Sequence, residues 1–463
     1  MVPTDSHAVS EVTNPYDSST VGRVYLAGEA DAENAIRRAL AGFARTKALP
    51  SNQRFDVLSF LSNGIKSRKE EFAQLITEEV GKPIHASRGE VDRAVLTYQL
   101  AAEEARRIQG EVVPLDLSAV GQNRYGVVRR FPLGIVLGIA PFNFPLNLVA
   151  HKLAPAIASG NAFILKPPPQ APLTSLKLAE LVESSGFPVE AFSVLPCSNE
   201  LAEKLAADPR IKMLSFTGSA AVGWHLKTKA GKKKVLLELG GNAGSIVDRS
   251  ADMSEAVRKN IVGSFVYAGQ VCIKVQRIYI HEEIFDEYTT RFVQAANALK
   301  AGDPKDPETV IGPVINDGAM ERILAWIREA VGQGAKILTG GGHHGRVLEP
   351  TVLVDVPREA KLFCEEIFGP VVTLHRFKTV EEAVTGVNDS AYGLQAGIFT
   401  NDYRSILYAY DHLDVGAVIV NDSPTFRVDH MPYGGIKESG FGREGLRYAI
   451  EEMTETKLLA MGI

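Results

Sequence analysis

Residues 134–165 read GIVLGIAPFNFPLNLVAHKLAPAIASGNAFIL, an apolar run, a helical pattern and a second apolar run in succession. Residues 135–139 have the short, continuously apolar pattern of a buried strand. Residues 146–158 place apolar side chains at helical spacing, and residues 162–165 are again strand-like. This order predicts two parallel strands joined by a right-handed crossover, the repeating unit of an α/β sheet.

The alternation continues toward the C-terminus. It adds a helix and two strands, at residues 173–184, 192–195 and 213–216. A second alternating region extends from about residue 239 to residue 435. Its expected strands lie at residues 245–247, 277–280, 371–375 and 417–420. Because strands and helices alternate in both regions, we expect two α/β domains with mainly parallel sheets.

The first hundred or so residues have a different pattern, which predicts mainly helices. The helical segments lie at residues 31–44, 53–79 and 90–109. We expect them to form a shell around the first sheet. No linker rich in Pro, Gly or Ser, no low-complexity segment and no fixed-period repeat separates the regions, so the predicted boundaries are several residues wide.

The composition is that of a globular protein. The 463 residues are 45% hydrophobic and 23% charged, which fits two or three domains with large cores. Fifty basic and 55 acidic residues give a formal net charge of −5. The short basic run 232–234 precedes the apolar residues 235–237 and is interpreted as the solvated lead-in to a strand. Nucleic acid is therefore not an expected partner.

The sequence predicts a cytoplasmic protein without a membrane partner. The N-terminus, MVPTDSHAVS, has no charged segment followed by an apolar one, and no stretch approaches the ~18 apolar residues of a membrane span. Cys197, Cys272 and Cys364 are odd in number and far apart, which favours reduced thiols over a disulfide framework. No metal site is predicted.

Three residues carry chemical groups at expected turns. Cys272 follows Gly269 in a predicted turn, where a thiol is open to a substrate. Glu238 ends an apolar strand before a glycine pair and is suited to accept a proton. Asn143 lies among aromatic and proline residues after the first strand, and its amide is suited to donate to an oxyanion. Singly, each also fits a structural role: a buried thiol, a strand-end carboxylate and a turn amide.

Together these motifs resemble the aldehyde dehydrogenase superfamily. The resemblance runs from residues 14–15 to residues 434–440, GGIKESG, with the motifs in the family's order. Glu238 and Cys272 are 34 positions apart (272 − 238), the interval of the family's Glu and Cys motifs.

The resemblance implies an α/β fold in three parts. These are a Rossmann-type cofactor domain at 1–113 and 131–238, an α/β catalytic domain at 239–433, and a small β oligomerisation arm at 114–130 and 434–463. Arm residues Asn123, Tyr125, Val127 and Val128 are expected in an extended hairpin strand. Because a thin arm cannot bury its own apolar face, a homodimer or homotetramer is expected.

The resemblance also implies a covalent mechanism. The Cys272 thiolate attacks an aldehyde, and Asn143 and the Cys272 backbone N–H hold the oxyanion. Hydride then leaves for the nicotinamide, and Glu238 activates water to cleave the thioester. A glutamate at position 238 favours hydrolysis over transfer of the acyl group to coenzyme A.

The implied cofactor is NAD or NADP. Residues 216–219, with Gly218 and Ser219, resemble the family's phosphate turn together with Gly223. Lys166 matches the lysine at the adenosine ribose, and Glu366 the glutamate at the nicotinamide ribose. The other expected cofactor contacts are Phe142, Leu239, Phe368 and Pro169. Pro169 stands where many NAD-preferring members have a glutamate, so a 2′-phosphate meets no repulsion and both cofactors are expected.

The expected substrate is a short polar or anionic aldehyde, because the matched tunnel positions are polar and partly cationic. These positions are Arg93, Phe144, Asn147, His151, Val266, Ile273, Arg427 and His430. The strings PLNLVAHKLAP and RVDHMPYGG are similar to those of lactaldehyde, glyceraldehyde and phosphonoacetaldehyde dehydrogenases.

Other interpretations remain open. Arg93 and Arg427 would play a structural role if they paired with Asp92, Asp429 or other surface acids, and the chain would then be a general short-chain aldehyde dehydrogenase. A structural or binding member of the family and an acylating dehydrogenase or esterase are further alternatives.

Overall fold

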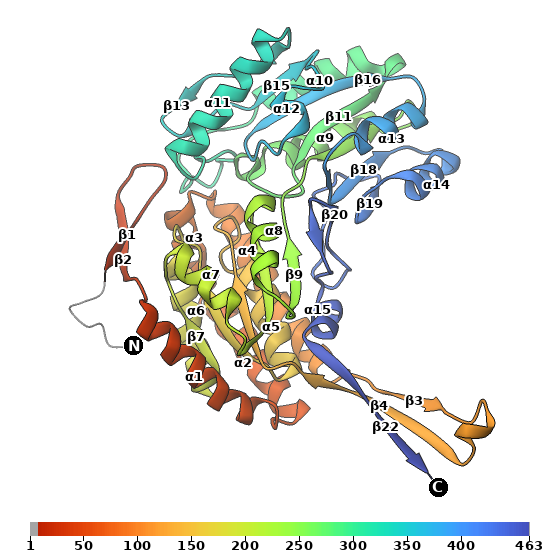
Figure 1. Cartoon of the computed structure of the whole chain (residues 1–463). Coiled ribbons are helices and arrows are strands. Elements are labelled where there is room, and N and C mark those ends of the chain that lie inside the picture. Colours follow the sequence, from red (N-terminus) through yellow and green to blue (C-terminus); the bar gives the residue numbers. More distant parts are fainter. Residues whose placement is uncertain (1–7, 463) are drawn as a thin grey trace.

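Two large sheets form the two lobes of the molecule, seen one above the other in Figure 1. The structure is a computed structural model, and it describes residues 8–462. The lower sheet has the strand order β21-β9-β8-β5-β6-β7. Its strands are β5 (Ile135–Ile139), β6 (Ala162–Lys166), β7 (Phe192–Val194), β8 (Ile211–Thr217), β9 (Lys234–Glu238) and β21 (Gly440–Phe441). Strands β5 to β9 are parallel, as predicted, and β21 adds antiparallel to β9.

Helices surround the lower sheet. They are α1 (Glu29–Thr46), α2 (Ser51–Ser67), α3 (Lys69–Val80), α4 (Ile84–Ala105), α5 (Asn147–Ser159), α6 (Pro172–Ser184), α7 (Asn199–Ala207), α8 (Ala220–Lys229) and α15 (Leu446–Glu452). The prediction of one helix over 53–79 is wrong, because Arg68 leaves the helical region and divides α2 from α3. The apolar pattern ran on across the bend because both helices face the same core, with Leu61 in α2 and Phe72 in α3 fully buried.

The upper sheet has the order β12-β15-β16-β11-β10-β18-β19 and is parallel except for β12, which pairs antiparallel with β15. Its strands are β10 (Ala243–Val247), β11 (Val275–His281), β12 (Lys336–Thr339), β15 (Thr351–Val354), β16 (Val371–Phe377), β18 (Gln395–Phe399) and β19 (Ala417–Val420). Its helices are α9 (Met253–Phe265), α10 (Phe285–Asn297), α11 (Asp317–Gly332), α12 (Lys361–Cys364), α13 (Val380–Asn388) and α14 (Tyr403–His412). The four strands expected in this region are confirmed, as β10, β11, β16 and β19.

Smaller strands complete the architecture. They are β1 (Val9–Thr13), β2 (Thr20–Tyr25), β13 (His343–His344), β14 (Val347–Leu348), β17 (Tyr392–Gly393) and β20 (Ile436–Lys437). The hairpin of β1 and β2 precedes the helices and was not expected. Among the helices within residues 8–462, none combines the length and the apolar character needed to cross a membrane.

A thin arm leaves the body at the lower right of Figure 1. It is a three-stranded antiparallel sheet of β3 (Glu111–Pro114), β4 (Arg124–Pro132) and β22 (Thr454–Gly462). Tyr125, Val127 and Val128 lie in β4, whereas Asn123 lies just before it with a left-handed φ of 58°. Residues 434–453 lie outside the arm sheet, because β21 joins the lower sheet and α15 follows it.

Candidate active site

A cleft of about 720 Å³ lies between the two sheets. One wall is formed where β5, β8 and β9 end, because parallel strands present their carboxyl ends at one edge. The other wall comes from the loop before β11 and from residues 365–368. Of the predicted site residues, the cleft is lined by Asn143, Cys272, Phe142, Gly218, Ser219, Leu239, Glu366, Phe368, Arg93, Phe144, Asn147, His151, Val266, Ile273 and Arg427.

Cys272 is presented to the cleft by a strained turn. The short 3₁₀ segment Val266–Gly269 contains three successive residues with positive φ, of which Tyr267 and Ala268 are not glycine. At Gly269 a Cβ atom would lie 2.4 Å from the carbonyl oxygen of Gly369, so only glycine fits. The Cys272 sulfur lies 3.1 Å from the hydroxyl of Tyr433.

The electrostatic surroundings keep Cys272 protonated at rest. Burial raises the pKa of the thiol to about 11, the hydrogen bond from Tyr433 and the charge of Arg427 lower the pKa, and Glu366 and Glu238 raise it further. Because only the thiolate form of a cysteine is strongly nucleophilic, Cys272 would have to lose this proton before it could act as a nucleophile.

Glu238 is a buried carboxyl group at the end of a strand. It ends β9 and is 3% exposed, and neither side-chain oxygen has a hydrogen-bond partner among the described residues. Burial raises its pKa well above the ordinary value, and the negative charge of Glu444 raises it further. Such a group is suited to proton exchange with a substrate-derived atom or a water.

Asn143 is held with its amide toward the loop that carries the thiol. Its Nδ2 donates to the carbonyl oxygen of Gln270 over 2.9 Å, and the side chain is almost fully buried. An amide NH₂ has two N–H donors, so one N–H remains beyond this bond. Cys272 and Asn143 thus line one cleft, with Glu238 just behind its lining.

The phosphate-turn residues lie at the beginning of α8. Ser219 immediately precedes this ten-residue helix, and Gly218, Ser219 and Ala220 line the cleft. A Cβ atom on Gly223 would lie 2.3 Å from the Leu239 side chain, so the glycine lets the helix approach β9 closely. The free N–H groups of a helix start favour an anion, which fits the pyrophosphate of a dinucleotide.

Glu366 and Phe368 lie further along the same cleft. A carboxylate oxygen of Glu366 accepts from the backbone N–H of Gly241 over 3.0 Å, and burial raises its pKa to about 7. Gly240 leaves room for this carboxylate, because a Cβ there would lie 2.4 Å from it. Phe368 has a left-handed φ of 47° and packs edge-on against Phe142 at 6.1 Å. These residues fit a cofactor that extends from α8 toward Cys272.

Lys166 and Pro169 lie outside the lining of the cleft. Lys166 ends β6, is 5% exposed, and has its pKa lowered by burial. Pro169 is exposed in the loop before α6.

Asn147 and His151, which were predicted to line the substrate tunnel, share one face of α5, as predicted. The Asn147 side chain accepts from Thr97 over 3.0 Å. His151 places Nε2 2.8 Å from a carboxylate oxygen of Asp429 and Nδ1 3.0 Å from the Arg427 guanidinium.

Both predicted arginines are paired with acids. Arg93 binds Asp429 with two N–H groups, at 2.7 and 3.3 Å, and its side chain is 32% exposed. Arg427 donates to Glu444 over 3.1 Å and lies almost completely buried above the ring of Tyr433. The pair of Arg93 with Asp429 is one that the sequence analysis left open. The partner of Arg427, Glu444, was not predicted.

His430 does not join this group. Asp429 points inward and is 3% exposed, so its neighbour His430 is directed outward, where it is exposed and outside the cleft lining. The expectation that His430 converges with His151 and the arginines is therefore wrong.

Sequence reasoning missed Tyr433, Glu444 and Lys152. Lys152 is fully buried and donates to Thr217 over 2.7 Å and to Glu444 over 3.0 Å. The available signal was a lysine in the mainly apolar string PLNLVAHKLAP. Tyr433 carried no local signal, since it meets Cys272 from 161 positions away.

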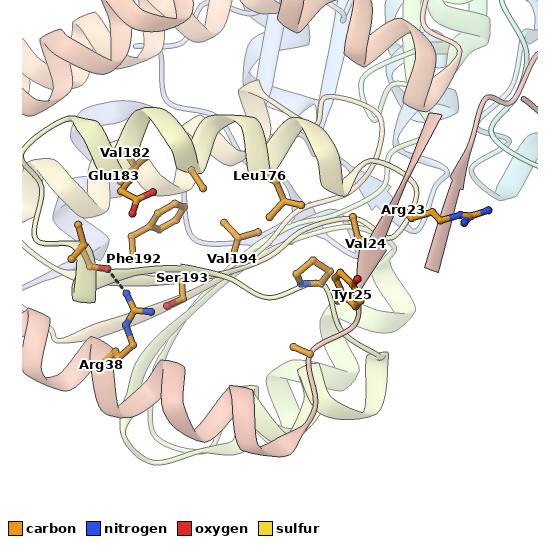
Figure 2. Close-up of a pocket in the computed structure, with 14 residues that line it drawn as sticks. Arg23, Val24, Tyr25, Arg38, Leu176, Val182, Glu183, Phe192, Ser193 and Val194 are labelled. Carbon is orange, nitrogen blue, oxygen red and sulfur yellow. Dashed lines mark hydrogen bonds between the residues drawn. The ribbon is translucent and has the colours of Figure 1, made fainter. Parts of the chain in front are cut away.

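A second cavity, of about 410 Å³, lies at the outer edge of the lower sheet (Figure 2). Figure 2 shows Leu176 and Val182 of α6 near Val194 of β7, with Arg38 of α1 bonded to the Val189 carbonyl. None of the predicted site residues, all of which the structure describes, lines this cavity.

The chain is similar to known proteins along its whole length. The sequence model of the aldehyde dehydrogenase family matches residues 1–459. A 3-sulfolactaldehyde dehydrogenase of Priestia megaterium is 43% identical over 454 residues, which cover 98% of this chain and 95% of that protein.

Two solved structures extend the similarity to the fold. Aldehyde dehydrogenase 21 of Physcomitrella patens, in complex with the reaction product succinate, is 47% identical with a TM-score of 0.98, covering 99% of this chain and 96% of that one. The glyceraldehyde-3-phosphate dehydrogenase GapN of Methanocaldococcus jannaschii, complexed with NADP, is 38% identical with a TM-score of 0.95, covering 99% and 100%. The chain therefore belongs to the aldehyde dehydrogenase family and is an NAD(P)-dependent oxidoreductase that acts on an aldehyde.

Proposed function

We propose that the chain oxidises a short, anionic aldehyde to its carboxylic acid by hydrolysis of a thioester on Cys272. The observation that carries the proposal is the arrangement of the cleft. Cys272 and Asn143 line it at one place, Glu238 lies behind them, and Arg93 and Arg427 line it on the substrate side.

Each of these residues has a separate role in the proposed reaction. The Cys272 thiol gives up its proton to water, and its sulfur forms a bond to the aldehyde carbon, leaving the charge on the oxygen. The free N–H of Asn143 and the Cys272 backbone N–H donate to this oxyanion. Loss of hydride from the same carbon turns the adduct into a thioester, and a bound nicotinamide would supply the acceptor for that hydride.

Hydrolysis completes the cycle. Glu238 in its ionised form takes a proton from water, whose oxygen attacks the thioester carbon. The C–S bond then breaks, the acid leaves, and the sulfur recovers a proton. Neither oxygen of the Glu238 carboxyl group bonds to another residue within 8–462, which supports this role. Acyl transfer to coenzyme A is the disfavoured alternative.

Two observations support an anionic substrate. The Arg427 Nε is a buried donor without a partner among the described residues, and such a donor favours an acceptor group in the cleft. Arg93 uses two of its five N–H donors on Asp429 and is partly exposed. The names of two similar proteins mention sulfolactaldehyde and succinate, and both of these compounds carry an anionic group.

A second candidate is a general short-chain aldehyde dehydrogenase. The ion pairs of Arg93 with Asp429 and of Arg427 with Glu444 favour it, because they already neutralise the two cations.

Rate measurements separate the anionic-aldehyde dehydrogenase from the general short-chain enzyme. They compare carboxylate- or sulfonate-terminated aldehydes with uncharged aldehydes of equal length. If Arg93 contacts the anion, Arg93→Ala lowers kcat/KM for the anionic aldehyde by roughly ten- to a hundredfold more than for the uncharged one. Arg88→Ala is the matched control, because Arg88 lies on the same helix in an exposed pair with Glu70. Equal losses for both aldehydes in Arg93→Ala would support the general enzyme.

We further propose a homodimer or homotetramer in the cytoplasm. The arm exposes Leu458, Leu459 and Val112, which would be covered by a second copy. The three free cysteines favour a reducing compartment.

A further inference from the structure

Tyr433 is fixed in the wall of the cleft against the thiol. Its side chain is 3% exposed and packs with Ile273 and Leu394. Its backbone N–H and C=O both bond to the backbone of Glu444, at 3.0 and 2.6 Å. The hydroxyl then lies 3.1 Å from the Cys272 sulfur.

Arg427 packs over the face of the Tyr433 ring and restricts its movement. Its guanidinium lies 3.5 Å from the ring centroid and is itself bonded to Glu444 and His151. A buried cation on the ring face restricts the ring, so the hydroxyl has a defined direction.

The proton of this contact lies on Tyr433 when the sulfur is ionised. A thiolate has no proton and can only accept a hydrogen bond. Burial raises the pKa of Tyr433 well above its ordinary value, so the phenol stays protonated at neutral and mildly alkaline pH. Other charges facing the sulfur are Arg427, which favours the thiolate, and Glu238 and Glu366, which oppose it.

We propose that Tyr433 is a catalytic residue whose phenol donates a hydrogen bond to the Cys272 sulfur, stabilising the thiolate and aiming it into the cleft. This inference rests on the proposed role of Cys272 as nucleophile. It assigns to Tyr433 a role separate from that of Asn143, which acts on the aldehyde oxygen, and from that of Glu238, which acts on water.

Removal of the Tyr433 hydroxyl should slow the attack by the Cys272 sulfur only moderately. A hydrogen bond to a charged acceptor lowers the thiol pKa by about one to two units. A less basic thiolate is also less nucleophilic, and this offsets roughly half of the gain. Tyr433→Phe should therefore lower the rate of attack by sulfur about 3- to 10-fold at any pH below the thiol pKa.

Alkylation of Cys272 tests the proposal without turnover. The enzyme is treated with iodoacetamide over a neutral to alkaline pH series, and the adduct is followed by intact-mass spectrometry. Cys272→Ala defines the background from Cys197 and Cys364. Tyr433→Phe should shift the rate profile to higher pH, so that raising the pH by about one unit or less restores the wild-type neutral rate.

Tyr288→Phe is the matched control, because Tyr288 is a buried tyrosine with one hydrogen bond, to Asn260 at 3.0 Å, in the core of the upper lobe. It should alkylate at the wild-type rate. A Tyr433→Phe profile identical to wild type would overturn the inference. Turnover retained by Cys272→Ala would instead overturn the proposed nucleophile, so the two failures are distinguishable.

Discussion

Cys272 and Glu238 both hold their protons more tightly than in water. Burial raises the pKa of the thiol to about 11 and that of the Glu238 carboxyl well above its ordinary value. The proposed mechanism needs the ionised form of each group, first for attack and then for hydrolysis. Both shifts therefore act in the same direction on the rate.

Because both pKa values are raised, the direction in which kcat/KM changes with pH can be predicted. Below its pKa, the ionised fraction of a group rises about tenfold for each pH unit, so kcat/KM should increase from neutral to mildly alkaline pH. Initial rates at constant ionic strength measure the profile. A kcat/KM that falls over this range would contradict the assignment of a protonated thiol as the resting state.

Replacement of Glu238 should affect one step only. Glu238→Gln keeps the size of the side chain but removes the base, so thioester hydrolysis should slow by roughly 10² to 10⁴-fold. The first turnover of cofactor reduction should persist, and an acyl-enzyme should accumulate in intact-mass spectra. Steady-state rates equal to wild type would show that another group activates water.

The residues around the thiol divide into those with and without local signals. Glu238, Asn143 and Cys272 have a local signal, because each follows an apolar run or lies at a turn, and their proposed roles come from the family resemblance. Tyr433 and Glu444 have no such signal, because folding brings them to Cys272 and Lys152 from 161 and 292 positions away.

At the scale of elements, helix α5 connects the fold to the site. Its first turn is held by Glu90 of α4, whose carboxylate oxygen accepts from the backbone N–H groups of Leu146 and Asn147 at 2.9 and 3.1 Å. The other oxygen of Glu90 binds Lys82, and both side chains are buried. The Nζ atom of Lys82 also lies 3.7 Å from the centroid of the Phe144 ring. Phe144 is the residue next to Asn143 in the sequence.

Breaking this pair should destabilise the protein. Glu90→Gln leaves the buried Lys82 without its counter-charge, which costs about 3 to 5 kcal/mol in the free energy of unfolding. Denaturant titration measures the loss. Asp92 lies on the same helix as Glu90 and forms an exposed pair with Lys69 of α3, so Asp92→Asn should change stability far less. Equal effects of the two variants would contradict the importance of burial.

The elements themselves were partly predictable. Continuous apolar runs identified β5 and β6, because parallel strands covered on both faces carry such runs. Strand β18 was missed because Gln395 begins its five-residue segment and Gly397 interrupts the apolar residues that follow. The hairpin of β1 and β2 was missed because short, half-exposed strands have little apolar pattern.

At the scale of the whole molecule, the arm has apolar side chains that the chain does not cover. Leu458 and Leu459 are 52% and 58% exposed on β22, and Val112 is 71% exposed on β3. A three-stranded sheet this thin has no second layer to pack on, so a neighbouring copy is the expected cover.

Charges placed on this surface should separate the copies. Leu458→Asp with Leu459→Asp should shift the sedimentation of the protein toward the monomer, because burying two unpaired carboxylates is costly. Val331→Asp, an exposed apolar residue on α11, is the control and should leave the assembly unchanged. A wild type that sediments as a monomer at micromolar concentration would refute the proposed assembly.

The covalent role of Cys272 is tested most directly by Cys272→Ala. Cofactor reduction with any aldehyde should fall to a trace, while the Kd of NAD(P), measured by titration, should stay at the wild-type value because the thiol acts on substrate alone. Cys197→Ala and Cys364→Ala should keep wild-type rates, since both residues lie outside the cleft lining. Substantial turnover by Cys272→Ala, with the cofactor bound normally, would contradict the covalent mechanism.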